Sequence, residues 1–187
     1  MKSKLIIRKK CLEKREIFFK NNGNDCLKMI DINFIISEIK SKLKILSIGI
    51  YHPIKSEISP LKLIEICQNF SLEICLPVIC KNTDELIFSK FYDQKCLAKN
   101  KYGIIEPTEL NKITPDIMFV PMVGFDKNLN RLGYGKGYYD RVISKIRKIK
   151  KIFVIGLAYD NQMVDCVPRE NHDEKMDFIL TEKQIYR

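Results

Sequence analysis

The sequence predicts an α/β fold of three layers, in which helices flank both faces of a mainly parallel sheet. Short apolar runs, each long enough for one strand, recur along the chain of 187 residues. Segments with a helical spacing of apolar residues lie between several of these runs. The runs are largely continuous in their apolar character, which is typical of strands covered on both faces. Strands that alternate with helices in this way favour a parallel sheet.

Four segments have the pattern of helices. They cover residues 3–20, 25–42, 60–70 and 137–149. The second ends in the charged sequence SKLK. The third has Ser59 as a candidate N-cap and Pro60 at the first helical position, where the missing N–H of proline costs nothing.

The predicted strands place three loops at one edge of the sheet. The strands cover residues 45–51, 71–79, 85–91, 116–121, 151–159 and 178–182. In a Rossmann-like sheet of this kind, ligands bind beyond the carboxyl ends of the strands. The segments 52–57, 122–140 and 160–173 begin there, so they are the first candidates for a binding site.

The composition is that of one globular domain, expected to span residues 1–187. The chain is 45% hydrophobic and 30% charged, an ordinary mixture for a protein with a core. No apolar run approaches the ~20 residues of a membrane helix, and the basic N-terminus lacks the uncharged centre of a signal peptide. The seven cysteines are odd in number and include no Cys-x-x-Cys pair, which argues against disulfides and zinc. We therefore expect a cytoplasmic protein that does not bind membranes, with most cysteines acting as small buried hydrophobic residues. We also expect a monomer.

The net charge of +10 allows two interpretations. A basic module that binds nucleic acid is one alternative, because lysine and arginine neutralise phosphates. The lysines are scattered along the whole chain and form no aromatic-interleaved patch. We therefore expect no nucleic-acid partner and favour attraction of small anionic ligands.

The segment 121–141, PMVGFDKNLNRLGYGKGYYDR, is the most informative part of the chain. Gly133, Gly135 and Gly137 stand at alternate positions, where backbone N–H groups can crowd together and face an anion. Arg131 and Lys136 add positive charge, and a helix N-terminus follows. The spacing differs from the dinucleotide fingerprint and from the Walker P-loop. The segment predicts a phosphate site, with a flexible turn as the alternative.

Three further groups of residues are ambiguous when taken alone. Lys4 and Arg8 share a helix face, which is usually a solvated one. Glu57 follows a strand end, where it could bind amino groups of a ligand or cap a helix. The segment 168–177 could hold a divalent cation, magnesium more than zinc, or be a solvated loop. Its ionisable side chains are Glu170, His172, Asp173 and Asp177.

Taken together, these segments resemble the 5-formyltetrahydrofolate cyclo-ligase family. The strongest match is GFDKNLNRLGYGKGYYDR at 124–141. IGLAYDNQMVDCVPRENHDEKMDFILTE at 155–182 resembles the closing segment of the family. The N-terminal pattern from Lys4 to Arg8 is a third match, and 51–57 and 103–107 are weaker ones. The chain departs from the family at Ser59-Pro60, where an Asp-Thr pair is common.

The resemblance implies an ATP- and Mg²⁺-dependent enzyme. The implied reaction converts 5-formyltetrahydrofolate to 5,10-methenyltetrahydrofolate and releases ADP and phosphate. The formyl oxygen attacks the γ-phosphate, N10 of the folate closes the ring, and phosphate leaves. Positioning and electrostatics would then dominate catalysis.

The resemblance also implies roles for individual residues. The implied ATP site is Lys4, Arg8, Arg131, Leu132, Gly133, Tyr134, Gly135, Lys136, Gly137, Tyr138 and Tyr139. The implied folate site is His52, Glu57, Tyr134, Gly135, Lys136, Gly137 and Tyr138. The implied catalytic residues are Arg131, Lys136 and Tyr138. The implied metal ligands are Asp140 and Asp173. Beside the nucleic-acid module, an α/β enzyme acting on a sugar phosphate or a coenzyme A derivative stays an alternative.

Overall fold

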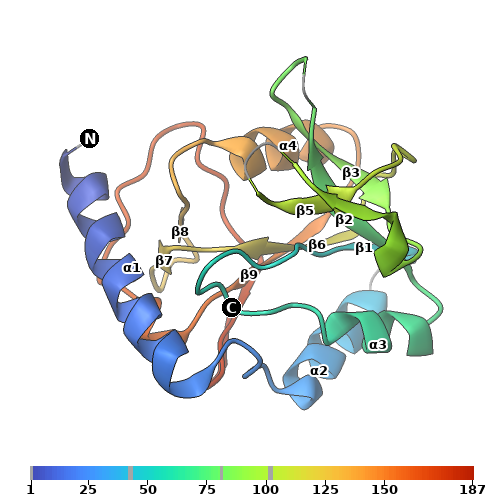
Figure 1. Cartoon of the computed structure of the whole chain (residues 1–187). Helices are drawn as coiled ribbons and strands as arrows, with labels where there is room; N and C mark the ends of the chain where they lie inside the picture. The colour runs from blue at the N-terminus through green and yellow to red at the C-terminus, as the bar shows by residue number, and fades with distance from the viewer. Residues whose placement is uncertain (1, 42–43, 81, 101–102) are drawn as a thin grey trace.

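A mainly parallel sheet forms the centre of the computed structural model, which describes residues 2–41, 44–80, 82–100 and 103–187 (Figure 1). Within these residues the sheet has seven strands in the order β11-β10-β9-β6-β1-β2-β3. The five from β10 to β2 run parallel, and the edge strands β3 and β11 are antiparallel to their neighbours. The strands are β1 (Ser47–Gly49), β2 (Glu73–Ile79), β3 (Leu86–Lys90), β6 (Ile117–Pro121), β9 (Phe153–Leu157), β10 (Phe178–Leu180) and β11 (Ile185–Tyr186).

Helices cover both faces of this sheet, as the sequence predicts. Helices α2 (Met29–Lys40) and α3 (Leu63–Asn69) lie on one face, and α4 (Tyr138–Arg147) lies on the other (Figure 1). The long helix α1 (Lys2–Asn22) stands to one side, beside a small hairpin of β7 (Gly124–Phe125) and β8 (Arg131–Leu132). This arrangement places α1 across the end of the sheet where the glycine segment begins.

The two faces of β6 show why its sequence is continuously apolar. Ile117 and Phe119 pack into the core under α2 and α3, whereas Met118 and Val120 pack into the core under α4. Successive side chains of a strand point to opposite faces, so burial on both faces requires an apolar residue at every position. The expectation of a doubly covered sheet is confirmed.

Two helices start later in the structure than the sequence predicts. The helix expected over 60–70 begins at Leu63. The Ser59 hydroxyl accepts a hydrogen bond from the Leu61 N–H at 3.3 Å, so it closes a turn before the helix instead of capping it. The helix expected from residue 25 begins at Met29, and its expected end at residue 42 lies outside the described residues.

Several short elements were not predicted. These are the β7–β8 hairpin, β11, and a second hairpin of β4 (Leu97–Lys99) and β5 (Ile105–Pro107). Two short 3-10 helices, Gln94–Cys96 and Asp160–Gln162, also occur. Segments of two or three residues carry too little hydrophobic pattern to be recognised from the sequence.

The cysteines are free, and Cys11, Cys67 and Cys75 are buried. Their interpretation as small hydrophobic residues fits these three, but Cys166 is exposed. None of the described helices has the length and apolar character needed to cross a bilayer.

Candidate active site

A cavity of 740 Å³ opens between α1, the glycine segment and the loop before β10. The residues of the implied ATP, folate and metal sites all line this cavity, although they come from four distant parts of the chain. They are Lys4, Arg8, His52, Glu57, Arg131, Leu132, Gly133, Tyr134, Gly135, Lys136, Gly137, Tyr138, Tyr139, Asp140 and Asp173. Asp177, a further candidate for cation binding, does not line the cavity and pairs with Arg147. The remainder of the wall includes an apolar stretch of Pro77, Ile79, Leu86 and Ile104.

The buried carboxylate of Asp126 shapes the chain that leads into the glycine segment. Its Oδ1 accepts hydrogen bonds from the backbone N–H groups of Asn128 at 2.9 Å and Asn130 at 3.1 Å. Its Oδ2 accepts one from the Val167 N–H at 2.9 Å. Burial would raise the pKa of Asp126, but these hydrogen bonds and that of the Asn130 side chain lower it below its ordinary value. The β7–β8 hairpin is thereby fixed, and Arg131 in β8 is brought to the cavity wall.

The glycines are needed because the backbone turns sharply and guanidinium groups lie close against it. Gly135 and Gly137 have φ values of +97° and +67°, in the left-handed region that favours glycine. A Cβ at Gly133 would meet Nη1 of Arg131 at 2.9 Å, and one at Gly135 would meet Nη2 of Arg8 at 3.3 Å. Helix α4 begins directly after Gly137, without a side-chain cap, so its N-terminus is available to an anion.

Helix α1 is tied to the glycine segment and to the loop before β10. The Arg8 Nε donates a hydrogen bond to the Gly133 carbonyl at 2.8 Å. The Lys4 ammonium donates to Oδ2 of Asp173 at 2.7 Å and lies 3.2 Å from Oε1 of Glu170. Burial alone would lower the pKa of Lys4, but these two carboxylates outweigh it and raise the pKa. Asp173 responds in the opposite sense: burial would raise its pKa, but Lys4 and the Glu170 N–H lower it.

Arg131 makes a similar ion pair with Asp140. Its Nη2 donates to Oδ2 of Asp140 at 2.7 Å, and both side chains are largely buried. Its guanidinium also lies over the ring of Tyr139, 5.6 Å from the centroid. The Lys4–Asp173 and Arg131–Asp140 ion pairs therefore each join a cation that was predicted to bind phosphate to a carboxylate that was predicted to bind a metal ion.

These carboxylates do not form a ready-made metal site. Asp140 uses Oδ2 for Arg131 and accepts a 3.3 Å hydrogen bond from the Glu174 N–H at Oδ1. Asp173 uses Oδ2 for Lys4. No three His, Cys, Asp or Glu side chains of the described residues cluster as a metal site would require. In each acid the cation pairs with Oδ2, so Oδ1 is the oxygen that could reach a metal ion while the ion pair stays in place.

Glu57 lines the same cavity, close to Tyr134, and is 3% exposed. Its Oε2 accepts a hydrogen bond from the Ile54 N–H at 2.9 Å, but its buried Oε1 has no partner among the described residues. Burial raises its pKa to about 7, although the Ile54 N–H, the charge of Arg15 and the Tyr134 hydroxyl act in the opposite direction. A buried carboxylate oxygen without a partner can accept a hydrogen bond from a ligand. His52 lies nearby, half-buried in the same wall.

The remaining predicted residues surround the glycine segment. Lys136 is exposed at the cavity mouth. The Tyr138 hydroxyl donates to Oδ1 of Asp84 at 2.8 Å, which ties the start of α4 to the β2–β3 turn. Tyr134 is 38% exposed, and its hydroxyl accepts a 2.5 Å hydrogen bond from Arg15.

The sequence reasoning missed Arg15, and it gave no role to Asn100 or Glu106 in the cavity wall. Arg15 is 1% exposed, which is rare for an arginine. A signal was present: Lys4, Arg8, Cys11 and Arg15 recur at the spacing of one helix face. Because three of these four residues are cationic, the pattern resembles a solvated face.

The chain is similar to known proteins along most of its length. The model of the 5-formyltetrahydrofolate cyclo-ligase family matches residues 1–182. A 5-formyltetrahydrofolate cyclo-ligase of Haemophilus influenzae is 34% identical over 140 residues, covering 72% of this chain and 74% of that protein. The solved structure of 5,10-methenyltetrahydrofolate synthetase from Aquifex aeolicus has a TM-score of 0.71 and 31% identity, covering 98% of this chain and 92% of that one. A synthetase of the same name from Mycoplasma pneumoniae has a TM-score of 0.69 and 27% identity, with coverages of 96% and 98%. With its fold and nearly all of its length matched, the chain belongs to the 5-formyltetrahydrofolate cyclo-ligase family, which is a family of ligases.

Proposed function

We propose that this protein converts 5-formyltetrahydrofolate to 5,10-methenyltetrahydrofolate at the expense of ATP, with release of ADP and phosphate. The observation that carries the proposal is the single 740 Å³ cavity, whose wall includes a cationic, glycine-rich part and a buried carboxylate, Glu57, with one oxygen that has no partner among the described residues. A polyphosphate needs the cationic part, and the amino and N–H donors of a pterin ring suit the carboxylate. The monomeric state, the cytoplasmic location and the single-domain organisation stay predictions.

The ATP phosphates are proposed to lie at the glycine segment. Lys4 and Arg8 line the cavity from α1, whereas Lys136 belongs to the segment itself, which leads directly into the N-terminus of α4. Cations and N–H groups that converge on one point stabilise the charge of a transferring phosphoryl group. Positive φ at Gly135 and Gly137 exposes the intervening backbone to the anion.

The folate is proposed to lie with its pterin ring toward Glu57. Oε1 of Glu57 would accept hydrogen bonds from the pterin donors, and His52 lines the same end. The apolar wall of Pro77, Ile79, Leu86 and Ile104 suits the aromatic remainder of the substrate. In this orientation, the formyl group at N5 lies between Glu57 and the glycine segment, within reach of both ligand sites.

The chemistry then requires two steps. The formyl oxygen attacks the γ-phosphorus, and the bond to the β-phosphate oxygen breaks, which releases ADP. N10 attacks the activated formyl carbon, the carbon–oxygen bond to phosphate breaks, and N10 loses its proton. Arg131 and Lys136 are proposed to neutralise the phosphoryl oxygens. The Tyr138 hydroxyl is proposed to orient them once it releases the Asp84 carboxylate, to which it donates in the free protein. Holding both ligands in one cavity supplies the remaining acceleration.

Magnesium is proposed to accompany the nucleotide. In proteins Mg²⁺ keeps several waters and takes one or two carboxylates plus substrate phosphates, so a complete protein cage is not required. Asp140 and Asp173 are the candidate carboxylates, through the Oδ1 atoms that do not pair with Arg131 and Lys4, or through both oxygens where phosphate takes over these cations. When bound, the ion would offset the charge of the phosphates.

The test is the formation of the methenyl chromophore by the purified protein from 5-formyltetrahydrofolate, ATP and Mg²⁺. Omitting ATP should abolish the product. Arg131→Ala and Lys136→Ala should each lose most of the turnover, whereas Lys148→Ala, an exposed lysine after the last turn of α4, should retain it. Failure of the wild-type protein to form product with both substrates present would refute the proposal.

A further inference from the structure

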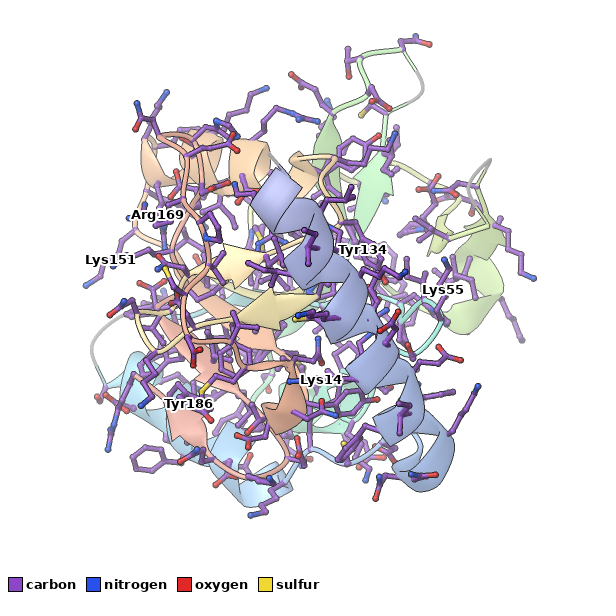
Figure 2. All side chains as sticks on the ribbon, turned by 90° about the vertical axis from the view of Figure 1, so that its left-hand side faces the viewer. Lys14, Lys55, Tyr134, Lys151, Arg169 and Tyr186 are labelled. Carbon is purple, nitrogen blue, oxygen red and sulfur yellow. The ribbon has the colours of Figure 1, made fainter. Side chains whose placement is uncertain are left out.

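Arg15 is the largest fully buried side chain described in this protein, and it lies behind the cavity wall. It comes from the middle of α1, on the same face as Lys4 and Arg8. Figure 2, which looks onto α1, shows Tyr134 beside this helix. Glu57 and Tyr134 are among the described residues that line the cavity, but Arg15 is not. Any effect of Arg15 on a ligand must therefore act through its neighbours.

Those neighbours belong to two segments of the chain, 52–57 and 122–140. The Arg15 Nε donates to the Ser56 hydroxyl at 3.2 Å, next to Glu57. Its Nη1 donates to the Met122 carbonyl at 3.4 Å, after β6. Its Nη2 donates to the Tyr134 hydroxyl at 2.5 Å, and the guanidinium lies 5.5 Å from the centroid of that ring. One planar group thus joins the folate end of the cavity to the glycine segment.

Burying a guanidinium is costly, and a neutral leucine or methionine would complete the core with less penalty. The charge also acts on the site, because it opposes the effect of burial on the Glu57 carboxyl. These observations are poorly explained by packing alone. We propose that Arg15 is a positioning residue, which holds Glu57 and Tyr134 in the arrangement that binds the folate. This inference rests on the proposed function and names a further residue for that same site.

The helix geometry gives the proposal a specific signature. Arg8 and Lys4 lie seven and eleven residues before Arg15, or roughly 10 and 16 Å along the helix axis. Loss of Arg15 leaves the Lys4 and Arg8 contacts in place, so it should disturb the positions of Glu57 and Tyr134 more than the contacts of these two cations with phosphate. In Arg15→Met, which keeps an unbranched chain of similar length, we expect the KM for 5-formyltetrahydrofolate to rise about tenfold, the equivalent of one charge-assisted hydrogen bond. The KM for ATP should stay within about twofold.

Two further variants identify the route of the effect. Arg15→Lys keeps the charge near Glu57 but replaces the planar fork, whose Nε and Nη2 reach Ser56 and Tyr134, with a single nitrogen, so it should recover part of the loss. Tyr134→Phe removes the acceptor hydroxyl, and Arg15→Met should cost less in that background than in the wild type. Lys14→Met is the matched control: an exposed lysine on the same helix, whose loss should change neither KM. If Arg15→Met does not fold, the KM values for 5-formyltetrahydrofolate and ATP are compared in Arg15→Lys and Tyr134→Phe instead.

The experiment is steady-state kinetics for both substrates, with thermal unfolding measured on each variant. A selective rise in the folate KM supports the proposal. A folded Arg15→Met variant with both KM values near wild type overturns it, and so does an equal rise in both KM values accompanied by a lower melting temperature. A wild-type protein without turnover would refute the proposed function itself, and this inference with it.

Discussion

The pKa of about 7 for Glu57 makes the stability of the folded protein depend on pH, and Glu57→Gln should remove that dependence. In the unfolded chain the carboxyl titrates near 4.5, so folding raises its pKa by about 2.5 units. At about 1.36 kcal/mol per unit, the corresponding change in the free energy of unfolding is about 3 kcal/mol. Because the folded state holds this proton more tightly, the contribution is fully present below pH 4.5 and is lost as the pH rises through about 7.

The physical cause is visible around the carboxyl group. Glu57 is 3% exposed, and its Oε1 has no partner among the described residues. The Ile54 N–H and the charge of Arg15 offset this burial only in part. A glutamine at this position keeps the shape and an oxygen for the Ile54 N–H, but it has no proton to lose in this range. The substitution therefore isolates the ionisation of one group.

The assay is urea denaturation of the wild type and of Glu57→Gln between pH 4.5 and pH 8. Subtracting the two stability curves cancels every other titrating group. We expect the wild type to lose about 3 kcal/mol relative to the variant over this range. Glu13→Gln, in an exposed position of α1, controls for the loss of one negative charge. A constant difference between the wild-type and Glu57→Gln curves would refute the reasoning.

Three further results are expected. Because ionised Glu57 is the better hydrogen-bond acceptor, the KM for 5-formyltetrahydrofolate should fall as the pH rises through about 7, and Glu57→Gln should lack this dependence. Gly135→Ala should raise the KM for ATP about tenfold, since a left-handed φ of +97° costs alanine roughly 1–2 kcal/mol and its Cβ would press on Arg8. Asp126→Asn should lower the free energy of unfolding by about 2–4 kcal/mol in urea denaturation, because a buried acceptor of several backbone N–H groups loses its charge.

Matched variants separate these effects from general damage. Gly23→Ala also places alanine at a positive φ, +72°, but nothing lies within 4 Å of its Cβ. It should lower stability and leave the KM for ATP unchanged, and an equal KM for ATP in both alanine variants would contradict the role given to Gly135. For Asp126, the exposed Asp93 is the control. Equal loss of stability in Asp93→Asn and Asp126→Asn would contradict the role of burial.

The central strands were predictable because burial on both faces leaves a strong mark on the sequence. The run predicted over 116–121 corresponds to β6, Ile117–Pro121, to within one residue. The start of α3 was not predictable from Ser59 and Pro60, since the same residue types also form turns. The β7–β8 hairpin depends on the buried Asp126, whose partners include Val167, 41 residues away. Contacts so distant in the sequence leave no local pattern.

The candidate site also contains residues that the sequence could identify and residues that it could not. The glycine segment was recognisable because alternate glycines beside cations have few structural uses, and the structure finds left-handed backbone at two of them. Lys4 and Glu57 were ambiguous by themselves and took on roles only through a resemblance that spans the chain. Arg15 could not be identified, because burial of a charged residue on a helix face depends on what lies opposite it. Its partners Ser56, Met122 and Tyr134 are contributed by tertiary structure alone.

The ion pairs at the cavity have a consequence for ligand selection under the proposed function. Lys4 and Arg131 point into a cavity that Arg8 and Lys136 also line, and such like charges would repel one another if no anion were present. Asp173 and Asp140, each 2.7 Å from its cation, neutralise this charge in the free protein. A phosphate group must therefore compete with the carboxylates for the same cations. Inorganic phosphate or sulfate brings no cation that could pair with the carboxylates it displaces. A nucleotide that carries a divalent cation offers them a new partner, so the two ion pairs favour the metal-bound nucleotide over smaller anions of the same charge.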